Sequence, residues 1–401
     1  MIYFQSLTRK ELETLILPLS RLRSSQARDC TQEQLDLKLK KQAAYRAKQI
    51  FNWVYQRFIT DWDQMTDLSK ELRSWLKENV EFYQLKQKVN QTSTDGTQKF
   101  LWNLDDQKTI ESVIIPAALQ EKSECDFEQE QRYKGISTED KDHKGEWTRL
   151  TACISSQVGC AMGCKFCLTG IQGLDRHLKT HEIITQVFEL KKIAPLTNIV
   201  FMGMGEPLHN VDAVIAACQI LVDDNGMNFS KRKVIVSTSG LVPNIKKLGE
   251  TIDVSLAVSL NGTYDEQREK VMPVNKRWNI KELMQACRNY PTGPHRKITF
   301  EYVLLKDVND SLDDAKRLVT FTKNIPSKIN LIPFNEHSGA SFKRSSDQTV
   351  KAFHRYLLDK KVTATVRISR GQDILAACGQ LRSLFGTARG TEKHKDFSPS
   401  V

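Results

Sequence analysis

Three cysteines in one short segment are the residues of this sequence whose type and spacing most directly predict chemistry. Cys160, Cys164 and Cys167 follow the spacing C-x3-C-x2-C. Three thiolates so close in sequence can bind three irons of a four-iron cluster and leave the fourth iron open to a small molecule. The alternatives are a disulfide framework and structural zinc, which takes four ligands, often as paired C-x2-C units; the sequence has no second pair. The spacing therefore favours one [4Fe-4S] cluster.

The composition indicates a large protein of a reducing compartment. The chain has 401 residues, more than one typical domain, and its nine cysteines are odd in number and irregularly spaced. Such cysteine usage argues against a secreted disulfide framework. No apolar run in the sequence approaches the roughly eighteen residues of a membrane span, and the N-terminus has no signal-peptide pattern. We therefore expect a cytoplasmic protein without a membrane partner.

Charge is distributed unevenly along the chain. Lys and Arg exceed Asp and Glu by 59 to 48, which gives a net charge of +11. Residues 117–147 hold nine acidic and five basic residues and carry −4, so the rest of the chain carries +15. A basic body is consistent with a polyanionic partner such as nucleic acid, although many proteins are mildly basic without binding one.

The chain before residue 117 divides into a helical part and a strand part. Apolar spacing predicts helices over residues 1–80, which begin with a cap at Thr8 and include a long helix over about 35–58. Over residues 81–116 the pattern changes to three strands separated by short polar turns. We expect a small helical N-terminal domain followed by a short β extension.

Residues 117–147 and 386–401 are expected to lie outside the folded core. The first segment is highly charged and poor in aliphatic side chains, so it can bury little surface, and we expect a mobile insertion. The second is a polar tail that we expect to be disordered.

Residues 148–385 alternate between short apolar strands and helical patterns. This alternation predicts an α/β fold with a parallel sheet, and six units predict a partial (βα)6 barrel. Ligands of such folds bind at the carboxyl ends of the strands, where the three cysteines would lie because they follow the first strand. The expected strands are 150–155, 198–204, 233–239, 253–260, 297–305 and 328–334, with a possible seventh over 362–369; the expected helices are 181–193, 211–222, 244–249, 279–289, 312–323 and 347–360.

Several further motifs occur in one order along the chain. They are Cys153-Ile154-Ser155-Ser156-Gln157-Val158-Gly159-Cys160, Gly203-Met204-Gly205-Glu206-Pro207-Leu208, Ser237-Thr238-Ser239-Gly240, Ile332-Pro333-Phe334-Asn335, and Arg370-Gly371-Gln372-Asp373-Ile374-Leu375-Ala376-Ala377-Cys378-Gly379-Gln380-Leu381. Together they resemble the RlmN/Cfr family of radical S-adenosylmethionine RNA methyltransferases over nearly the whole chain. The insertion after Pro116 is the main departure from the family pattern.

The resemblance implies a partial barrel of the radical S-adenosylmethionine type and an adenine methyltransferase. The methylated atom would be C2 of adenine in 23S rRNA, at the peptidyl-transferase centre, and in tRNA next to the anticodon. The alternative within the family is a C8 methyltransferase that confers ribosomal antibiotic resistance. Two other classes stay open: a radical enzyme acting on a small molecule, and a nonenzymatic RNA-binding protein with a structural metal.

The resemblance also implies how the cofactors would be bound. Cys160, Cys164 and Cys167 would hold the cluster, and Gly205 and Glu206 would contact the amino-acid end of S-adenosylmethionine. A solvated loop carboxylate is the alternative for Glu206. Many relatives have His where this chain has Asn261. The remaining positions that match cofactor contacts of the family are Ser237, Ser259, Leu260, Asn261 and Asn335.

Cys378 and Cys153 match the two catalytic thiols of the family. One S-adenosylmethionine would methylate Cys378, and a second would be cleaved to a radical that takes hydrogen from that methyl group. The resulting methylene radical would add to adenine, and Cys153 would attack the Cys378 sulfur, forming a transient disulfide that releases the product. The residues alone favour a small buried side chain for Cys378, since buried free cysteines are common.

Glu111 matches a family carboxylate proposed to take the C2 proton. It stands in Ile110-Glu111-Ser112-Val113, an alternating strand pattern in which a Glu ordinarily marks the solvent face.

The N-terminal helices are expected to bind RNA. Residues 38–57 hold six basic and no acidic residues, with interleaved aromatic residues, and we expect Lys38, Lys41 and Arg46 to contact phosphates. The alternative is an amphipathic helix with core aromatics and solvated charges. Residues 230–233 are a second possible phosphate contact. The expected partners are 23S rRNA, tRNA and an electron donor such as flavodoxin or ferredoxin, with the chain itself a monomer.

Overall fold

The computed structural model describes residues 2–20, 31–117, 149–293, 296–337 and 340–382. The expected insertion, apart from Ala117, and the expected tail lie outside the described residues. Among those described, no helix is both long enough and apolar enough to cross a membrane.

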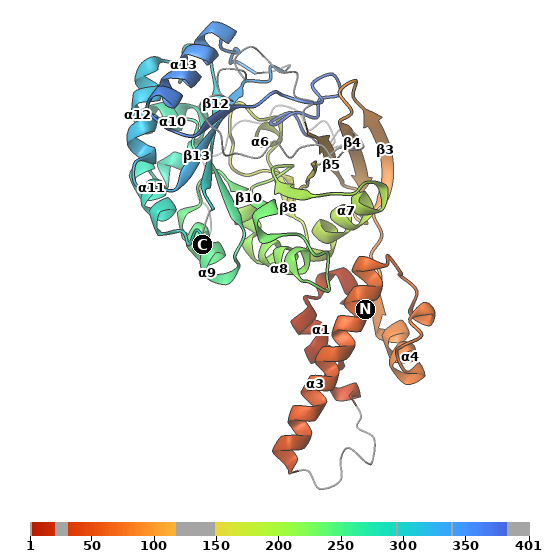
Figure 1. Ribbon diagram of the computed structural model, residues 1–401. Coiled ribbons are helices and arrows are strands. Elements are labelled where there is room, and N and C mark those ends of the chain that lie inside the picture. Colours follow the sequence, from red (N-terminus) through yellow and green to blue (C-terminus); the bar gives the residue numbers. More distant parts are fainter. Residues whose placement is uncertain (1, 21–30, 118–148, 294–295, 338–339, 383–401) are drawn as a thin grey trace, which may run out of the picture.

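One sheet of ten strands forms the frame of the molecule (Figure 1). Seven parallel strands make the barrel part, with helices covering their outer side, and β5 pairs antiparallel with β6 to extend the sheet by three strands. The parallel strands are β6 (Leu150–Cys153), β9 (Asn198–Phe201), β10 (Val234–Thr238), β11 (Ser255–Ser259), β12 (Ile298–Leu304), β13 (Ser327–Pro333) and β14 (Ala364–Val366); the antiparallel ones are β3 (Lys86–Thr92), β4 (Gln98–Asn103) and β5 (Thr109–Pro116).

The expected α/β architecture is confirmed, and the possible seventh strand is β14. The six expected barrel helices correspond to α7 (Thr180–Ile193), α8 (Val211–Val222), α9 (Val242–Thr251), α11 (Ile280–Asn289), α12 (Leu312–Thr322) and α13 (Asp347–Asp359). Sequence reasoning missed α6 (Leu168–Gln172), α10 (Asp265–Val271) and a small hairpin of β7 (Gln157–Gly159) and β8 (Leu174–His177). These elements are too short for hydrophobic periodicity to reveal them.

The N-terminal segment is helical, as expected. Thr8 caps α1 (Arg9–Ile16) through a capping box with Glu11. The long helix α3 (Gln32–Phe51) ends earlier than expected and continues as a π-helical turn over Asn52–Gln56. A third helix, α4 (Lys70–Asn79), leads into β2 (Val80–Glu81), which pairs with β1 (Ile2–Tyr3) and so closes this part of the chain on itself.

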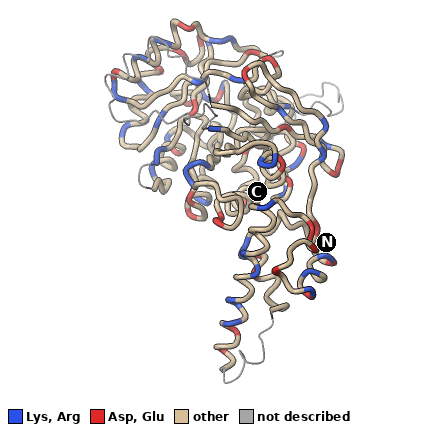
Figure 2. The backbone as a smooth tube through the Cα atoms, turned by 45° about the vertical axis from the view of Figure 1, so that its right-hand side comes forward, with Lys and Arg blue, Asp and Glu red and all other residues tan. Residues whose placement is uncertain are grey.

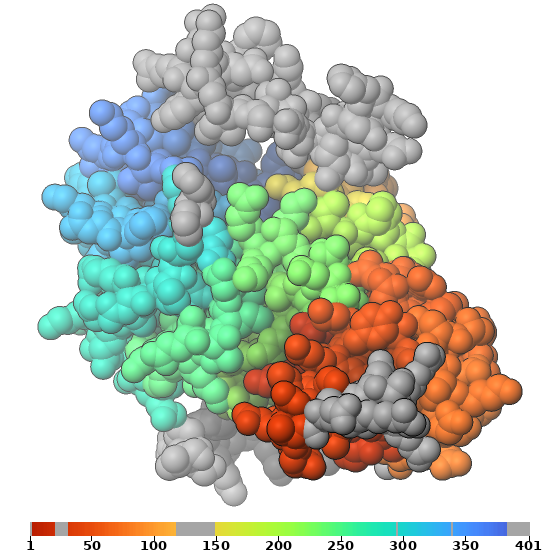
Figure 3. Space-filling model, turned by 60° about the horizontal axis from the view of Figure 1, so that its bottom comes forward, coloured from red at the N-terminus to blue at the C-terminus, as the bar shows by residue number. Residues whose placement is uncertain are grey.

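The N-terminal helices share a hydrophobic core with the barrel. Tyr55 is completely buried, and its ring lies 6.3 Å from that of Phe188 on α7, while Phe58 approaches the same ring at 5.4 Å. Figure 3 shows the N-terminal surface lying directly against the barrel surface, whereas α3 extends away from it (Figure 1). The domain boundaries at residues 80, 116, 147 and 385 stay predictions.

Candidate active site

The three cysteines lie in a backbone loop that hydrogen bonds fix at both ends. The loop leaves β7 and enters α6, and its backbone is tied by Cys160 N donating to Gly173 O at 2.9 Å and Cys167 N donating to Cys164 O at 3.1 Å. Cys160 is buried, and Cys164 and Cys167 are partly buried. The loop follows β6, so it lies at the carboxyl end of the barrel, as the sequence predicts.

The three thiols are suited to a cluster rather than to one ion. Burial raises the pKa of Cys160 to about 12. Burial, and then the charges of the other two thiols, raise the pKa of Cys164 well above its usual range. Among the described residues, no three His, Cys, Asp or Glu side chains converge on a single metal ion. Each iron of a cluster binds a different thiolate, so three neighbouring thiols can hold three of its irons, and cluster binding would release their protons.

Gly205 and Glu206 form a buried polar corner beside these cysteines. Gly205 has φ +101°, and a Cβ there would lie 2.8 Å from Gln157 N, so only glycine fits. The Glu206 carboxylate is buried and accepts hydrogen bonds from Leu208 N at 3.0 Å and Ser239 N at 2.7 Å. The solvated-carboxylate reading of Glu206 is therefore wrong.

The Glu206 carboxylate has no ion-pair partner among the described residues, so its charge is available to a ligand. Burial raises its pKa, and its charge in turn raises the pKa of Cys160 and Cys164, so it lies near the cluster position. None of the ion pairs found among the described residues includes Glu206. A buried carboxylate without a protein cation fits the amino group of S-adenosylmethionine.

The carboxyl ends of β10 and β11 are held together by Arg268, a residue that sequence reasoning missed. Its guanidinium is fully buried and donates to Ser239 O at 2.5 Å, Ser259 O at 3.2 Å and Leu260 O at 2.8 Å. Burial lowers the pKa of Arg268 to about 10. Ser237 lies near the end of β10, so Arg268 orders the strand ends that carry several predicted cofactor contacts.

Asn261 uses its side chain inside the protein. The residue is buried with φ +50°; its Oδ1 accepts from Val303 N at 2.7 Å, and its Nδ2 donates to Met272 Sδ at 3.2 Å. These bonds fix the end of β11 against β12 and leave its backbone, rather than its amide group, for a ligand.

Removing the guanidinium should destabilise the barrel. Arg268→Met would leave three buried carbonyl oxygens without this donor, and each unsatisfied acceptor costs about 1–3 kcal/mol, so the free energy of unfolding should fall by roughly 3 kcal/mol or more. Thermal denaturation checks this, with Lys316→Met in an exposed ion pair on α12 as the control. Equal melting temperatures for the two variants would contradict the role of Arg268.

Cys378 lies in a loop after β14 (residues 371–382, the Cys378 loop) that several elements hold in place. Asn335 Nδ2 donates to Cys378 O at 3.3 Å, and Leu168 N donates to Gly379 O at 2.7 Å. Asp373 accepts from Ser93 Oγ at 2.6 Å, in the turn between β3 and β4. The loop thereby joins the end of β13, the start of α6 and the β extension.

The structure brings Cys378 and Cys153 close enough to interact electrostatically. Cys153 is buried at the end of β6, and its pKa is raised by burial and then by the charge of Cys378. Cys378 is an exposed residue, unlike a core cysteine, although surrounding protein and then the charge of Glu301 raise the pKa of its thiol. The seven cysteines within the described residues are all free thiols, so the Cys153–Cys378 disulfide stays a prediction.

Glu111 is buried, not solvent-facing. Its side chain is 1% exposed and its pKa is raised by burial, while Lys99 at 3.2 Å and the backbone N–H of Arg382 at 3.0 Å favour its charged form. The register joins β4 to β5 and β5 to β6, so Glu111, Lys99 and Cys153 lie on one face of the sheet.

A second set of polar side chains, buried at Glu301 and Asn330 and exposed at Thr365, crosses three barrel strands. Glu301, Asn330 and Thr365 stand opposite one another on β12, β13 and β14. Asn330 Nδ2 donates to Glu301 Oε1 at 2.9 Å, and Thr365 Oγ1 donates to Asn330 Oδ1 at 2.9 Å. Because the charge of Glu301 raises the pKa of Cys378, this set lies on the side of the predicted catalytic thiol.

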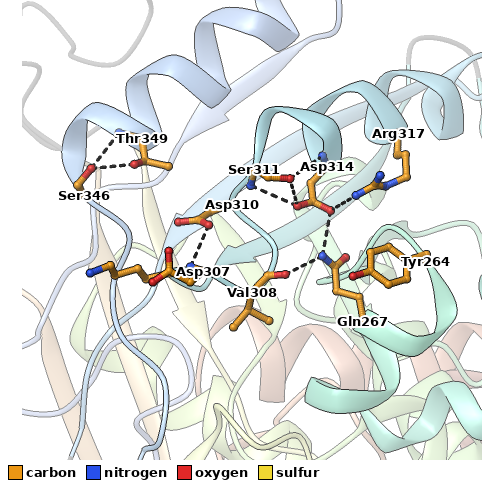
Figure 4. Close-up of a pocket in the computed structure, with 11 residues that line it drawn as sticks. Tyr264, Gln267, Asp307, Val308, Asp310, Ser311, Asp314, Arg317, Ser346 and Thr349 are labelled. Carbon is orange, nitrogen blue, oxygen red and sulfur yellow. Dashed lines mark hydrogen bonds and ion pairs between the residues drawn. The ribbon is translucent and has the colours of Figure 1, made fainter.

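A cavity of about 560 Å³ lies outside this site, between α10, the loop before α12 and the start of α13 (Figure 4). Within its lining, Asp314 accepts from Arg317 Nη2 at 2.7 Å and from Gln267 Nε2 at 2.9 Å. It contains none of the predicted site residues, so we assign it no part in the chemistry.

Comparison with known proteins identifies the family. Residues 154–319 match the radical SAM superfamily, and residues 29–82 match the ribosomal RNA large subunit methyltransferase N-terminal domain. A dual-specificity RNA methyltransferase RlmN of Geobacter sulfurreducens is 51% identical over 89% of this chain and 92% of its own length. The chain belongs to the RlmN family of radical S-adenosylmethionine RNA methyltransferases. A further RlmN, of Geotalea uraniireducens, is 49% identical over 86% of this chain and 92% of its own.

A solved structure agrees with this assignment. A radical SAM methyltransferase from Sphaerobacter thermophilus superposes with a TM-score of 0.76 at 37% identity, covering 95% of this chain and 99% of that one. Membership of the RlmN family makes this chain an RNA methyltransferase that uses a [4Fe-4S] cluster and S-adenosylmethionine.

Proposed function

We propose that this protein methylates C2 of adenine in 23S rRNA, at the peptidyl-transferase centre, and in tRNA next to the anticodon. The observation that carries the proposal is the meeting of three elements at one end of the barrel. The cluster cysteines follow β6, Cys153 ends β6 beside Glu111 on β5, and the Cys378 loop closes over them. C8 methylation is the alternative that the experiments below distinguish.

The bound cluster and two molecules of S-adenosylmethionine per methylation would supply an electron, a methyl group and a hydrogen-abstracting radical. Cys378 carries the methyl group on its sulfur and joins adenine C2 through that carbon. Glu111 accepts the C2 proton and becomes a carboxylic acid, while the electron pair of the C–H bond stays on the adduct. The unpaired electron of the adduct must also leave before release, and the oxidised cluster would be its one-electron acceptor.

Cys153 then releases the product. Its thiolate attacks the Cys378 sulfur, the bond from that sulfur to carbon breaks, and the carbon keeps the electron pair and takes a proton to become the methyl group. The Cys153–Cys378 disulfide that forms must be reduced by an external thiol before the next turnover. Burial disfavours the Cys153 thiolate, so this thiol must lose its proton before or during the attack.

The exposed side of α3 is the proposed RNA surface (Figure 2). Lys38, Lys41, Tyr45 and Lys48 are exposed at helical spacing on α3, so cations and one aromatic ring share a face. Phe51 and Tyr55 are instead fully buried, as the amphipathic alternative requires.

Arg46 is held within the protein. It donates from Nη1 to Asp67 O at 2.9 Å and to Gln49 Oε1 at 2.7 Å. A phosphate contact by Arg46 stays a prediction, and it would compete with these two hydrogen bonds.

Neutralising two lysines of α3 should weaken RNA binding. The variant Lys38→Ala/Lys41→Ala should lower the slope of log affinity against log salt by about one per lost phosphate contact. Titration with an RNA stem-loop at several salt concentrations measures the slope. The control, Lys316→Ala/Lys323→Ala, makes the same charge change on and just after α12, on the far side of the barrel (Figure 1). Equal slopes for both variants would mean that the lysines of α3 are solvated and do not contact RNA phosphates.

The remaining partners are part of the same proposal. A small electron-transfer protein such as flavodoxin or ferredoxin would reduce the cluster, because RNA methylation supplies no electron of its own. One chain provides every residue of the candidate site, so we propose a monomer. RNA substrates of this kind place the enzyme in the cytoplasm.

Nucleoside analysis of cells with and without the gene tests the substrates. We expect 2-methyladenosine to disappear from both 23S rRNA and tRNA when the gene is deleted, and to return with the gene. Its persistence in both RNAs, or loss of 8-methyladenosine instead, would refute the proposal.

A further inference from the structure

A buried ion pair between two strands of the β extension lies beside the predicted catalytic thiols. Lys99 on β4 and Glu111 on β5 approach to 3.2 Å between Nζ and Oε1, with side chains 7% and 1% exposed. An ion pair that is this deeply buried adds little to the stability of the fold, because both charges lose their hydration. A role in the chemistry therefore explains its position better than a role in folding.

The strand register places this pair next to Cys153. Lys99 stands opposite Val113 on β5, and Val113 stands opposite Cys153 on β6. Opposed residues point to the same side of a sheet, as do residues two apart, so Lys99, Glu111 and Cys153 share one face. Cys153 is thus the titratable side chain that β6 adds to this face.

The same pair also holds the Cys378 loop at two points. Lys99 Nζ donates to Leu375 O at 3.4 Å, three residues before Cys378. Glu111 Oε2 accepts from Arg382 N at 3.0 Å, four residues after it. Cys378, the thiol that would carry the methyl group, therefore lies in the sequence between two residues that contact this ion pair.

We propose that Lys99 is a positioning residue for methyl transfer, which clamps the Cys378 loop against β5 and keeps Glu111 in its ionised form. This inference rests on the proposed function, in which Glu111 accepts the C2 proton. Lys99 itself touches neither the adenine nor the cofactor in this scheme.

Charge around Glu111 sets the expected pH dependence. Burial raises the pKa of Glu111, while the ammonium of Lys99 on β4 and then the backbone N–H and charge of Arg382 lower it. Glu111 acts as a base only when ionised, so turnover falls as the pH drops through its pKa. Removing Lys99 removes a charge that favours the ionised form, so this fall should begin at a higher pH.

Single-turnover methylation across a pH series tests the role of Lys99. For Lys99→Met we expect S-methylation of Cys378 to persist, because that step does not use Glu111. The pH of half-maximal turnover should rise by about one unit or more, and Lys99→Arg should restore much of it. Lys86→Met, the same change at an exposed position of β3, should match the wild type.

Three outcomes separate this inference from the proposed function. If Lys99→Met has the turnover and pH dependence of the wild type, the positioning role is wrong. If Lys99→Met does not fold, Lys99→Gln decides the question in the same way, since its amide can still donate to Leu375 O but carries no charge. If Glu111→Gln turns over normally, the base assignment of the proposed function fails, whatever Lys99 does.

Discussion

The Cys153→Ala protein is expected to accumulate a covalent adduct with RNA, whereas the Cys378→Ala protein is expected to form none. Cys378→Ala has no sulfur to methylate, so no link to adenine can form. Cys153→Ala keeps that sulfur and can add to adenine, but it lacks the thiol that would break the link. The adduct should appear as a shifted band on a denaturing gel that collapses on nuclease treatment.

The double variant is the control for this experiment. Because the adduct depends on Cys378, Cys153→Ala/Cys378→Ala should show no shifted band. Cys218→Ala, which removes a buried thiol on α8, should behave as the wild type. Normal turnover by Cys153→Ala, without trapped RNA, would rule out release by a second thiol.

Replacing any one of Cys160, Cys164 and Cys167 by Ala should abolish both the cluster and methylation. Each thiolate would bind a separate iron, and the two thiolates left in each variant are too few to retain a four-iron cluster. The fold should survive, because the sheet and its helices do not depend on the cysteine loop. Iron and sulfide analysis after anaerobic reconstitution measures the loss, with Cys287→Ala on α11, a buried core position, as the matched control.

Full iron content in any of the three variants would remove that residue from the cluster. Wild-type methylation by any of them would contradict the radical mechanism as a whole.

Much of the barrel could be predicted because its signals are local. The β6 and β9–β13 strands are short apolar runs, and the helices between them have regular apolar spacing, so alternation alone indicates the parallel sheet. The cysteine loop is equally local, since its three ligands lie within one turn-rich segment.

Contacts between distant segments could not be predicted in this way. Lys99 and Glu111 meet the Cys378 loop more than 260 residues later in the chain, and no periodicity in β4 or β5 records that contact. Arg268 looks like an ordinary charge of a polar helix, yet it is fully buried because three strand-end carbonyls surround it.

Glu111 shows why an alternating pattern can mislead. A strand of an antiparallel extension commonly has one wet face, and the pattern of β5 fits that expectation. In the structure nearly all of β5 is buried, because the Cys378 loop covers the face that carries Glu111. The resemblance to a known family supplied the role of Glu111, which the residues alone would have assigned to solvent.

The measurement that tests the central claim most directly is the position of the methyl group made by the purified enzyme. Reconstituted protein, S-adenosylmethionine and a reductant are incubated with an unmodified 23S rRNA fragment, and the digested nucleosides are compared by mass spectrometry with authentic standards. Membership of the RlmN family predicts 2-methyladenosine, made with Cys378, Cys153 and Glu111. Formation of 8-methyladenosine instead, or no methylated adenosine from a protein with full iron content, would contradict it.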